Sequence, residues 1–380
     1  MLEQQVLKTI FLVFYGAVAA LNMSACLYLL LRRSNAIAPD ITSPARLRRW
    51  TAAFFAASAL SHLWNLPVFL LSSPSDVMLS YLVGALLDCM TIGPLALILL
   101  ITMLQDRTRP LWPVAVGVAP FVVVMALCVA TRSDALLQVL YALFVVLAVA
   151  ITVYMVRALR QYGRWLRDNY ADLEHKEVWQ SFVVLVIMLL VFGIYTYIYE
   201  GMAFLYAMLI GFAVLICYLL WRVETLSDLS IPSLQSLPVE EDATNEIEDE
   251  KNNGLSEATL GNIGALLQKH CIDTRLYLQH DLTLVQLTKA IGTNRTYLTK
   301  YFASQGTTYN TYINDLRIHH FMNFYREAVD NCRLFTAHQL AQESGFRNYN
   351  TFSSAFKRKT GQSVTAWMKA ASKQEGQGSI

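Results

Sequence analysis

The feature that most constrains the fold is a series of seven long apolar runs before residue 222. Each is near the 20 or so residues that a helix needs to cross the hydrocarbon core of a bilayer. The runs are residues 9–31, 50–71, 77–103, 111–130, 135–156, 179–199 and 202–221. The first lacks the basic leader and the small-residue cleavage site of a signal peptide. With 55% hydrophobic and 15% charged residues overall, the chain is predicted to form a seven-helix membrane bundle over residues 1–222.

Basic residues in the loops predict the orientation of this bundle. The loops after the first, third and fifth runs carry Lys or Arg, the second and sixth carry neither, and the fourth carries only Arg132. Because basic loops stay in the cytoplasm, the N-terminus is predicted outside and residue 222 inside. We therefore expect a multi-pass protein of the cell inner membrane with its C-terminal part in the cytoplasm. An even number of spans would reverse that placement.

Few polar residues interrupt the runs, and they are the candidates for a sensing site. A carboxylate in hydrocarbon is costly, so Asp88 should face the bundle interior and find a partner. One interpretation is a ligand or proton site built around Asp88 and His62, and the other is an interhelical hydrogen bond that holds the bundle together. Both remain open for Asp88, whereas the second is favoured for His62, Asn65 and Asn22. Glu200, beside interfacial tyrosines, is a further candidate for binding a cationic group.

Residues 255–380 have a different pattern, in which two segments share one layout. Each predicts a short helix, a turn with Gly, and a second helix opened by Asn, which together form a helix-turn-helix. The corresponding residues are Thr283, Gly292 and Asn294 in the first segment and Thr336, Gly345 and Asn348 in the second. A long helix from Tyr309 to about Glu327 is predicted between them. The whole chain is thus predicted to be all-α.

This region resembles the DNA-binding domain of AraC/XylS-type transcription regulators. The first motif is similar to the family pattern through Gly292, Tyr297-Leu298 and Phe302. The second keeps the more diagnostic run Gly345-Phe346, Phe352, Ala355-Phe356-Lys357-Arg358 and Gly361. Departures occur at Ser363-Val364, Trp367-Met368 and Phe321, where the family usually has Thr-Pro, Tyr-Arg and a small residue. The resemblance covers about the last third of the chain and implies a domain that binds double-stranded promoter DNA.

Charge and helix length agree with DNA as the partner. Residues 255–380 carry a net charge of +6, which suits contacts with phosphates. A helix of roughly 30 Å can set two reading helices near one turn of B-DNA apart, about 34 Å. Arg295 could bind guanine, Asn350 could bind adenine, and Lys357 with Arg358 would hold phosphates. The predicted DNA contacts are Arg295, Thr296, Thr299, Lys300, Arg347, Tyr349, Asn350, Ser353, Lys357 and Arg358, although any one of these could simply be solvated.

Residues 223–254 predict an acidic, flexible linker between the two regions. Nine Asp and Glu residues stand against one Lys, with serines and prolines before them. Such a segment cannot bury enough apolar surface to fold. The ordinary interpretation is a solvated spacer. The alternative is that the acids compete with DNA for the basic domain until the membrane part changes state.

The favoured interpretation is a membrane-embedded one-component transcription regulator, in which the bundle senses a signal that is a small molecule, lipid-borne or presented by another membrane protein. A transporter-like protein with a regulatory DNA-binding domain is the alternative, although the spans show no internal repeat. No enzyme motif is present, and the six cysteines have no ligand spacing, so neither catalysis nor a metal or other cofactor is expected. The oligomeric state stays open, with a homodimer among the alternatives.

Overall fold

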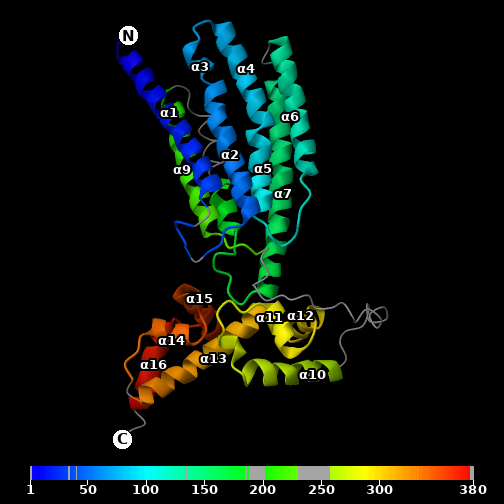
Figure 1. The fold of residues 1–380 in the computed structure, drawn as a ribbon, viewed down its shortest axis with the longest axis vertical. Coiled ribbons are helices and arrows are strands. Elements are labelled where there is room, and N and C mark those ends of the chain that lie inside the picture. The colour runs from blue at the N-terminus through cyan, green and yellow to red at the C-terminus, as the bar shows by residue number, and fades with distance from the viewer. Residues whose placement is uncertain are drawn as a thin grey trace. The chain divides into compact units, whose positions relative to one another are not determined.

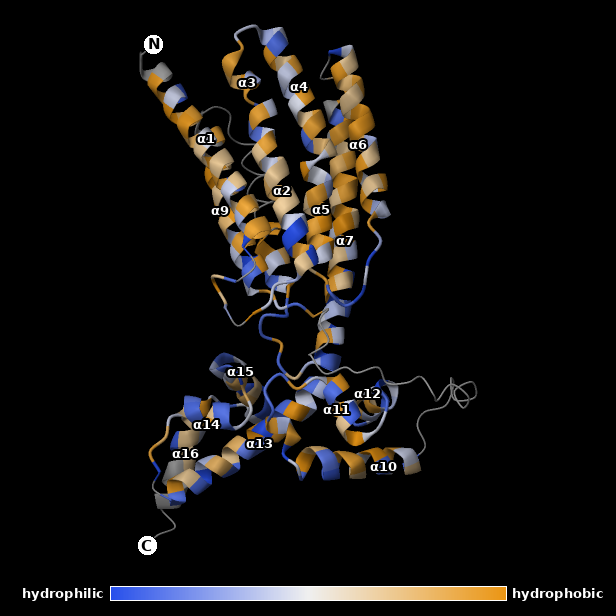
Figure 2. Cartoon of the chain, in the orientation of Figure 1, coloured by the Kyte–Doolittle hydropathy of each residue, from blue (hydrophilic) through white to orange (hydrophobic). Residues whose placement is uncertain are grey.

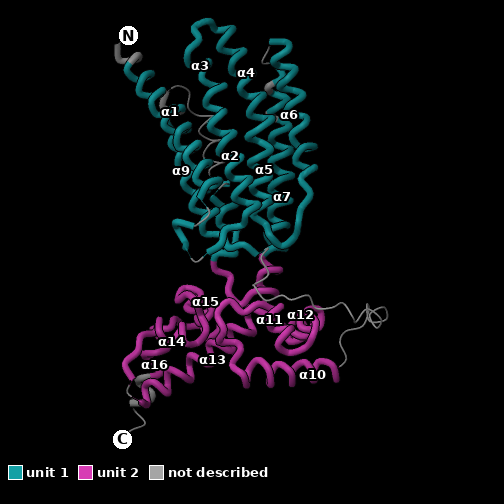
Figure 3. The backbone as a smooth tube through the Cα atoms, viewed as in Figure 1, with its two compact units in different colours: residues 1–162, 175–235 teal, residues 163–174, 236–380 magenta. Residues whose placement is uncertain are grey.

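The computed structural model describes residues 2–32, 35–39, 41–132, 135–184, 186–187, 202–229, 257–331 and 333–376. The chain divides into two compact units (Figure 3). We name the units after what the sequence predicts for them: the membrane unit comprises residues 1–162 and 175–235, and the DNA-binding unit comprises residues 163–174 and 236–380. Every regular element in the described ranges is a helix, as the sequence predicts. The membrane helices are rich in hydrophobic residues along their length (Figure 2).

The membrane unit is a bundle of long helices that run side by side (Figure 1). Helix α1 packs against α2 and α9, α2 packs against α5, and α4 packs against α6. Large hydrophobic side chains are exposed on the outside of these helices as well as buried between them, a composition that suits lipid surroundings. The helices are α1 (Leu2–Leu31), α2 (Ala45–Trp64), α3 (Pro67–Leu70), α4 (Pro74–Met90), α5 (Ile92–Thr102), α6 (Trp112–Thr131), α7 (Leu137–Asn169) and α9 (Met202–Thr225).

Six helical segments of the described ranges are long and apolar enough to cross a membrane. They are Val6–Leu31, Ala45–Leu70, Pro74–Thr102, Trp112–Thr131, Gln138–Asn169 and Leu205–Thr225. Each corresponds to one of the predicted runs. The remaining run, 179–199, lies for the most part outside the described residues, as does Glu200. The count of seven therefore stays a prediction.

Two of the spans are broken next to prolines. Pro94 lacks an N–H group, and α4 gives way to α5 at Thr91, three residues before it. In the second span, α2 ends at Trp64 and α3 begins at Pro67. Asn65 and Asp88 lie next to these two breaks, and their side chains are hydrogen-bonded to each other.

The last membrane helix extends beyond the predicted start of the linker. Helix α9 ends at Thr225, and Glu224, which the sequence counted among the linker acids, is fully buried. Its carboxylate pairs with Arg48 at 2.6 Å and accepts from the Tyr28 hydroxyl and the Ala36 N–H, both at 3.1 Å. A buried charge is tolerated where it is paired and hydrogen-bonded in this way. From residue 230 to 256 the predicted linker lies outside the described residues.

The DNA-binding unit consists of short helices arranged around one long helix, α13. Two separate hydrophobic cores form, one under each predicted motif, and α13 contributes to both. Helix α13 has 22 residues, so it is about 33 Å long. The elements are α10 (Glu257–Leu267), a π turn (Gln268–Ile272), a 3₁₀ turn (Leu276–Leu278), α11 (Leu284–Ile291), α12 (Arg295–Ser304), α13 (Tyr309–Asp330), α14 (Ala337–Glu343), α15 (Tyr349–Thr360) and α16 (Val364–Gly376).

Candidate nucleic-acid interface

Each of the two helix-turn-helix motifs begins with a cap that the sequence predicts. Thr283 and Thr336 cap α11 and α14, and each forms a capping box with the Gln three residues later. Such a box satisfies two backbone N–H groups that the first helical turn leaves open. Gly292 and Gly345 follow these helices with φ values of +69° and +89°, which glycine adopts without strain. Local sequence therefore fixes both turns.

The second helix of each motif, α12 and α15, is amphipathic. Asn294 and Asn348 cap these helices through side-chain oxygens that accept backbone N–H groups. One face of each helix is packed into the core beneath it. The buried residues are Leu298, Phe302, Phe352 and Phe356. The opposite face is left to solvent, as a helix that enters a DNA groove requires.

Most of the predicted DNA contacts lie on those open faces. The exposed ones are Arg295, Thr296, Thr299, Lys300, Arg347, Asn350, Lys357 and Arg358. Tyr349 and Ser353 are half-buried. The ring of Tyr349 stacks on His338 of α14, with centroids 6.0 Å apart and planes at 26°. Tyr349 therefore contributes to the packing of α14 against α15 as well as to the surface.

Two cations of the second motif lie in ion pairs. Arg347 donates to Asp281 at 2.9 Å, and both side chains are more than 40% exposed. A pair this open contributes at most about 1 kcal/mol, so Arg347 can exchange Asp281 for a DNA phosphate with little loss. Lys359 pairs with Asp315 of α13 at 2.5 Å. That second pair fixes the C-terminal end of α15 against the long helix.

The turn that carries Tyr277 and His280 holds the two motifs in one arrangement. Arg317 of α13, only 1% exposed, donates to the carbonyl oxygens of Tyr277 and Gln279, both at 2.7 Å. His280 Nδ1 lies 3.2 Å from the carbonyl oxygen of Gly345, to which it can donate. The turn before the first motif thus contacts both the connecting helix and the turn of the second motif. Through these bonds the turn links the first motif, α13 and the second motif.

Sequence reasoning missed Arg317 and counted it only as one of the basic residues. Asn310, Asn314 and Arg317 follow one another at helical i, i+4 and i+7 spacing, so they share one face of α13. All three are at least 97% buried. Helix α13 contributes to both hydrophobic cores, so a line of polar residues along one of its faces could have identified these three as buried and hydrogen-bonded. Buried polar groups of this kind require partners.

Two of the residues that depart from the family pattern, Phe321 and Trp367, contact each other in the core under the second motif. Phe321 is fully buried, with its ring centroid 4.5 Å from that of Phe352, 5.8 Å from that of Phe356 and 6.3 Å from that of Trp367. Trp367 also packs edge-on against Tyr325 at 5.3 Å. Two larger side chains therefore fill one volume together, and α16 docks through Trp367 onto α13 and α15.

In the membrane unit, Asp88 of α4 is hydrogen-bonded to the second span. Its two oxygens accept from Trp64 Nε1 at 3.0 Å and from Asn65 Nδ2 at 3.1 Å. Gly84 makes room for this contact, since a Cβ atom there would lie 2.0 Å from Asn65 Oδ1. Asn65, for which the sequence favoured a merely structural role, is thus a direct partner of Asp88. Trp64, the other partner, was not predicted, because no pattern in the sequence distinguishes it from the apolar residues around it.

His62 lies near this network but has other partners. Its Nδ1 is 2.7 Å from the carbonyl oxygen of Ser58, and its ring centroid is 4.6 Å from that of Tyr15. The hydrogen bonds of Asp88 therefore go to Trp64 and Asn65 and not to His62. Within the described ranges, no group of three or more His, Cys, Asp or Glu could hold a metal ion.

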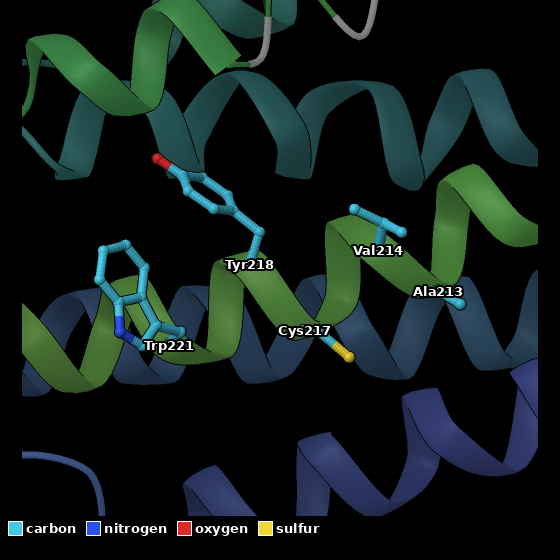
Figure 4. A pocket seen from close by; sticks show the side chains of 5 residues that line it. All are labelled: Ala213, Val214, Cys217, Tyr218 and Trp221. Atoms are coloured by element: carbon cyan, nitrogen blue, oxygen red, sulfur yellow. The ribbon is translucent and has the colours of Figure 1, made fainter.

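The membrane unit also has an apolar hollow of about 480 Å³ along α9 (Figure 4). It is lined by Ala213, Val214, Cys217, Tyr218 and Trp221. These residues belong to the span Leu205–Thr225, and none of them is charged. A surface of this composition suits lipid tails, which are as apolar as the side chains themselves. It therefore gives no argument for a polar ligand.

Residues 287–370 match the family model of a helix-turn-helix domain. The match covers 84 of the 380 residues, from within α11 to α16, and so includes α12, α13, α14 and α15 complete. No curated protein and no solved structure matches the chain. The C-terminal part is therefore similar to the DNA-binding domains of AraC-type regulators, and it follows a unit whose apolar helices suggest embedding in a membrane.

Proposed function

We propose that the chain is a membrane-embedded one-component transcription regulator of the AraC/XylS type. One observation carries this proposal. Two capped helix-turn-helix motifs, which the matched residues 287–370 cover except for the start of α11, follow a unit with membrane-length apolar helices in the same chain. Such a chain can receive a signal at the bilayer and bind a promoter without a separate messenger.

The proposed DNA contact uses α12 and α15 as recognition helices in successive major grooves. The 22 residues of α13 span about 33 Å, close to the 34 Å or so of one turn of B-DNA. Arg295 would donate two bonds to guanine, and Asn350 would bind adenine. Lys357 and Arg358 would hold phosphates. The remaining contacts would come from Thr296, Thr299, Lys300, Arg347, Tyr349 and Ser353.

In this proposal the membrane unit is the sensor, with seven spans and its N-terminus outside. The Asp88 network is the first candidate for the sensing site, because it joins two proline-broken spans through hydrogen bonds that a ligand or a proton could rearrange. His62 and Glu200 are further candidates. Asp88→Asn keeps the size of the side chain and removes its charge. If this variant is stable and its transcriptional response is unchanged, Asp88 is not part of the sensor.

Mapping the protein along the chromosome tests the DNA-binding part of the proposal. Full-length protein, and a chain without residues 1–222, should enrich a common set of promoter sites. Arg295→Ala and Asn350→Ala should each weaken those sites by about 5- to 150-fold, the equivalent of 1–3 kcal/mol for a bidentate base contact. The matched controls are Arg326→Ala and Asn323→Ala, which replace exposed residues of the same types on α13.

Two outcomes would contradict the proposal. In the first, no sequence is enriched by the full-length protein or by the chain without residues 1–222. In the second, Arg295→Ala and Asn350→Ala leave the enriched set unchanged. Orientation has a separate test, since a reporter fused after residue 380 should be active in the cytoplasm. Activity of that reporter only outside the cytoplasm would exclude a regulator of this kind.

A further inference from the structure

A short segment after the fifth span belongs to the same compact unit as the DNA-binding region (Figure 3). Helix α7 runs from Leu137 to Asn169, so its final residues and the chain that follows are a direct continuation of a membrane-length helix. We call residues 168–174 the docked segment. Both backbone and side-chain groups of this segment contact the rest of the DNA-binding unit.

Ala171 anchors the docked segment. It is fully buried and part of the core under the first motif. Its N–H donates to the carbonyl oxygen of Leu282 at 3.4 Å. Its own carbonyl oxygen accepts from Asn310 Nδ2 at 2.6 Å and from Asn314 Nδ2 at 3.1 Å. Two buried amides therefore converge on one carbonyl group, which is a directional contact and not burial alone.

The residues beside Ala171 extend this contact. Tyr170 forms an antiparallel bridge with Thr283, the N-cap of α11. The carbonyl oxygen of Tyr170 accepts from Asn310 Nδ2 at 3.1 Å. On the other side, Asp172 Oδ1 accepts from the N–H of Glu174 at 3.1 Å, which folds the segment into a turn. The backbone is thus held at several successive positions.

An acidic side chain of the docked segment lies at the start of the second recognition helix. Glu174 Oε1 accepts from Asn348 Nδ2 at 2.6 Å, and Asn348 is the N-cap of α15. The N-terminal residues of recognition helices are those that contact base edges, and helix N-termini also attract phosphates.

We propose that the docked segment is an intramolecular latch, which must leave before the two recognition helices bind duplex DNA. It lies against the start of α15 and against the N-cap of α11 in the first motif, and its Glu174 carboxylate occupies a group at a helix start that would otherwise meet DNA. The inference rests on the proposed function, to which it adds control of the same surface. Because the segment continues α7, a displacement of that helix would pull the latch directly.

The latch has a quantitative consequence for DNA affinity. If only the undocked form binds, the observed Kd equals the intrinsic Kd divided by the undocked fraction. A hydrogen bond to a neutral group shifts such an equilibrium about fivefold, and one to a charged group shifts it more. Breaking the Glu174–Asn348 bond should therefore lower the observed Kd by at least about fivefold. Removing the Ala171 anchor should lower it by more than about tenfold.

The test uses the full-length protein in lipid nanodiscs with a 40-bp duplex of random sequence at 50 mM salt. Glu174→Ala removes the contact with Asn348, and Ala171→Arg blocks the anchor. Glu177→Ala is the matched control, since that carboxylate accepts from Trp179 in the membrane unit. Glu174→Ala and Ala171→Arg should bind the duplex more tightly than the wild type, and Glu177→Ala should not. Adding the duplex to the wild type should also increase hydrogen exchange of residues 168–174.

The outcomes separate the latch from the function on which it rests. Equal affinity of the wild type and Glu174→Ala, with no change in hydrogen exchange, overturns the latch and leaves DNA binding standing. Weaker binding by Glu174→Ala also overturns it, because the segment would then support the binding form. Ala171→Arg is interpreted only when its domain exchanges hydrogen as slowly as the wild type. If no variant, the wild type included, binds duplex at 50 mM salt, the proposed function fails and the latch fails with it.

Discussion

Gly345→Ala tests whether the two motifs are held together through the turn at residues 276–279. Gly345 has a φ of +89°. A Cβ atom added there would lie 2.8 Å from both the Cα and the carbonyl oxygen of Leu278. Gly361 also has a positive φ, +75°, but a Cβ atom there would meet nothing within 4 Å. Gly361→Ala is therefore a matched control that introduces the backbone strain without the collision.

The two substitutions should differ by a calculable amount. Both place an L-residue in the left-handed region, which costs about 1–2 kcal/mol. Gly345→Ala must also displace the backbone of Leu278, which weakens the His280 bond to residue 345 and strains the two bonds from Arg317. At about 1 kcal/mol for each of the three bonds, the total destabilisation should be about 4–5 kcal/mol. For Gly361→Ala it should stay near 1–2 kcal/mol.

Hydrogen exchange measured by mass spectrometry on the full-length protein reports both effects locally. In Gly345→Ala, peptides covering residues 276–282 and 345–352 should lose protection together, since one contact joins them. In Gly361→Ala, the peptide 276–282 should keep the protection of the wild type. If both variants lower the opening free energy equally, or if Gly345→Ala affects only its own motif, the two motifs are not coupled through this turn.

Three further expectations concern the DNA-binding unit. Phe321→Ala should destabilise it by about 3–5 kcal/mol, because the ring is fully buried against three aromatic side chains; hydrogen exchange in α13 and α15 as slow as in the wild type would contradict this. Burial and the charge of Arg275 lower the pKa of His320 below 6.5, so the folded form binds fewer protons than the unfolded one. The contribution of His320 to the free energy of unfolding should be complete above about pH 6.5 and should be lost as the pH falls from there toward the pKa of His320 in the folded protein. His320→Gln should therefore reduce the pH dependence of stability measured by urea unfolding. Burial raises the pKa of Cys271 to about 11, so iodoacetamide at pH 9 should modify it only after unfolding, as measured on its peptide by mass spectrometry; rapid modification of the folded protein would show that the thiol is exposed.

Much of the secondary structure could be predicted because neighbours within one or two helical turns determine it. Thr283 and Thr336 reach only three residues ahead to cap their helices, and Pro94 acts on the turn before it. The length of an apolar run is itself a local property, and six such runs are helices of membrane length. The faces of α12 and α15 followed from their own periodicity. Each of these features depends on contacts inside one segment.

The sequence alone thus determined the all-helical elements, their caps and the polar faces that point toward a DNA partner. Tertiary structure decided which distant groups meet. It brought Arg317 to carbonyl groups some 40 residues away, Asn65 to Asp88 of the next span, and Ala171 to two amides about 140 residues further on. Periodicity reports which face of a helix is buried but not what lies against it, because a buried polar group can be satisfied by any partner that the path of the chain brings close.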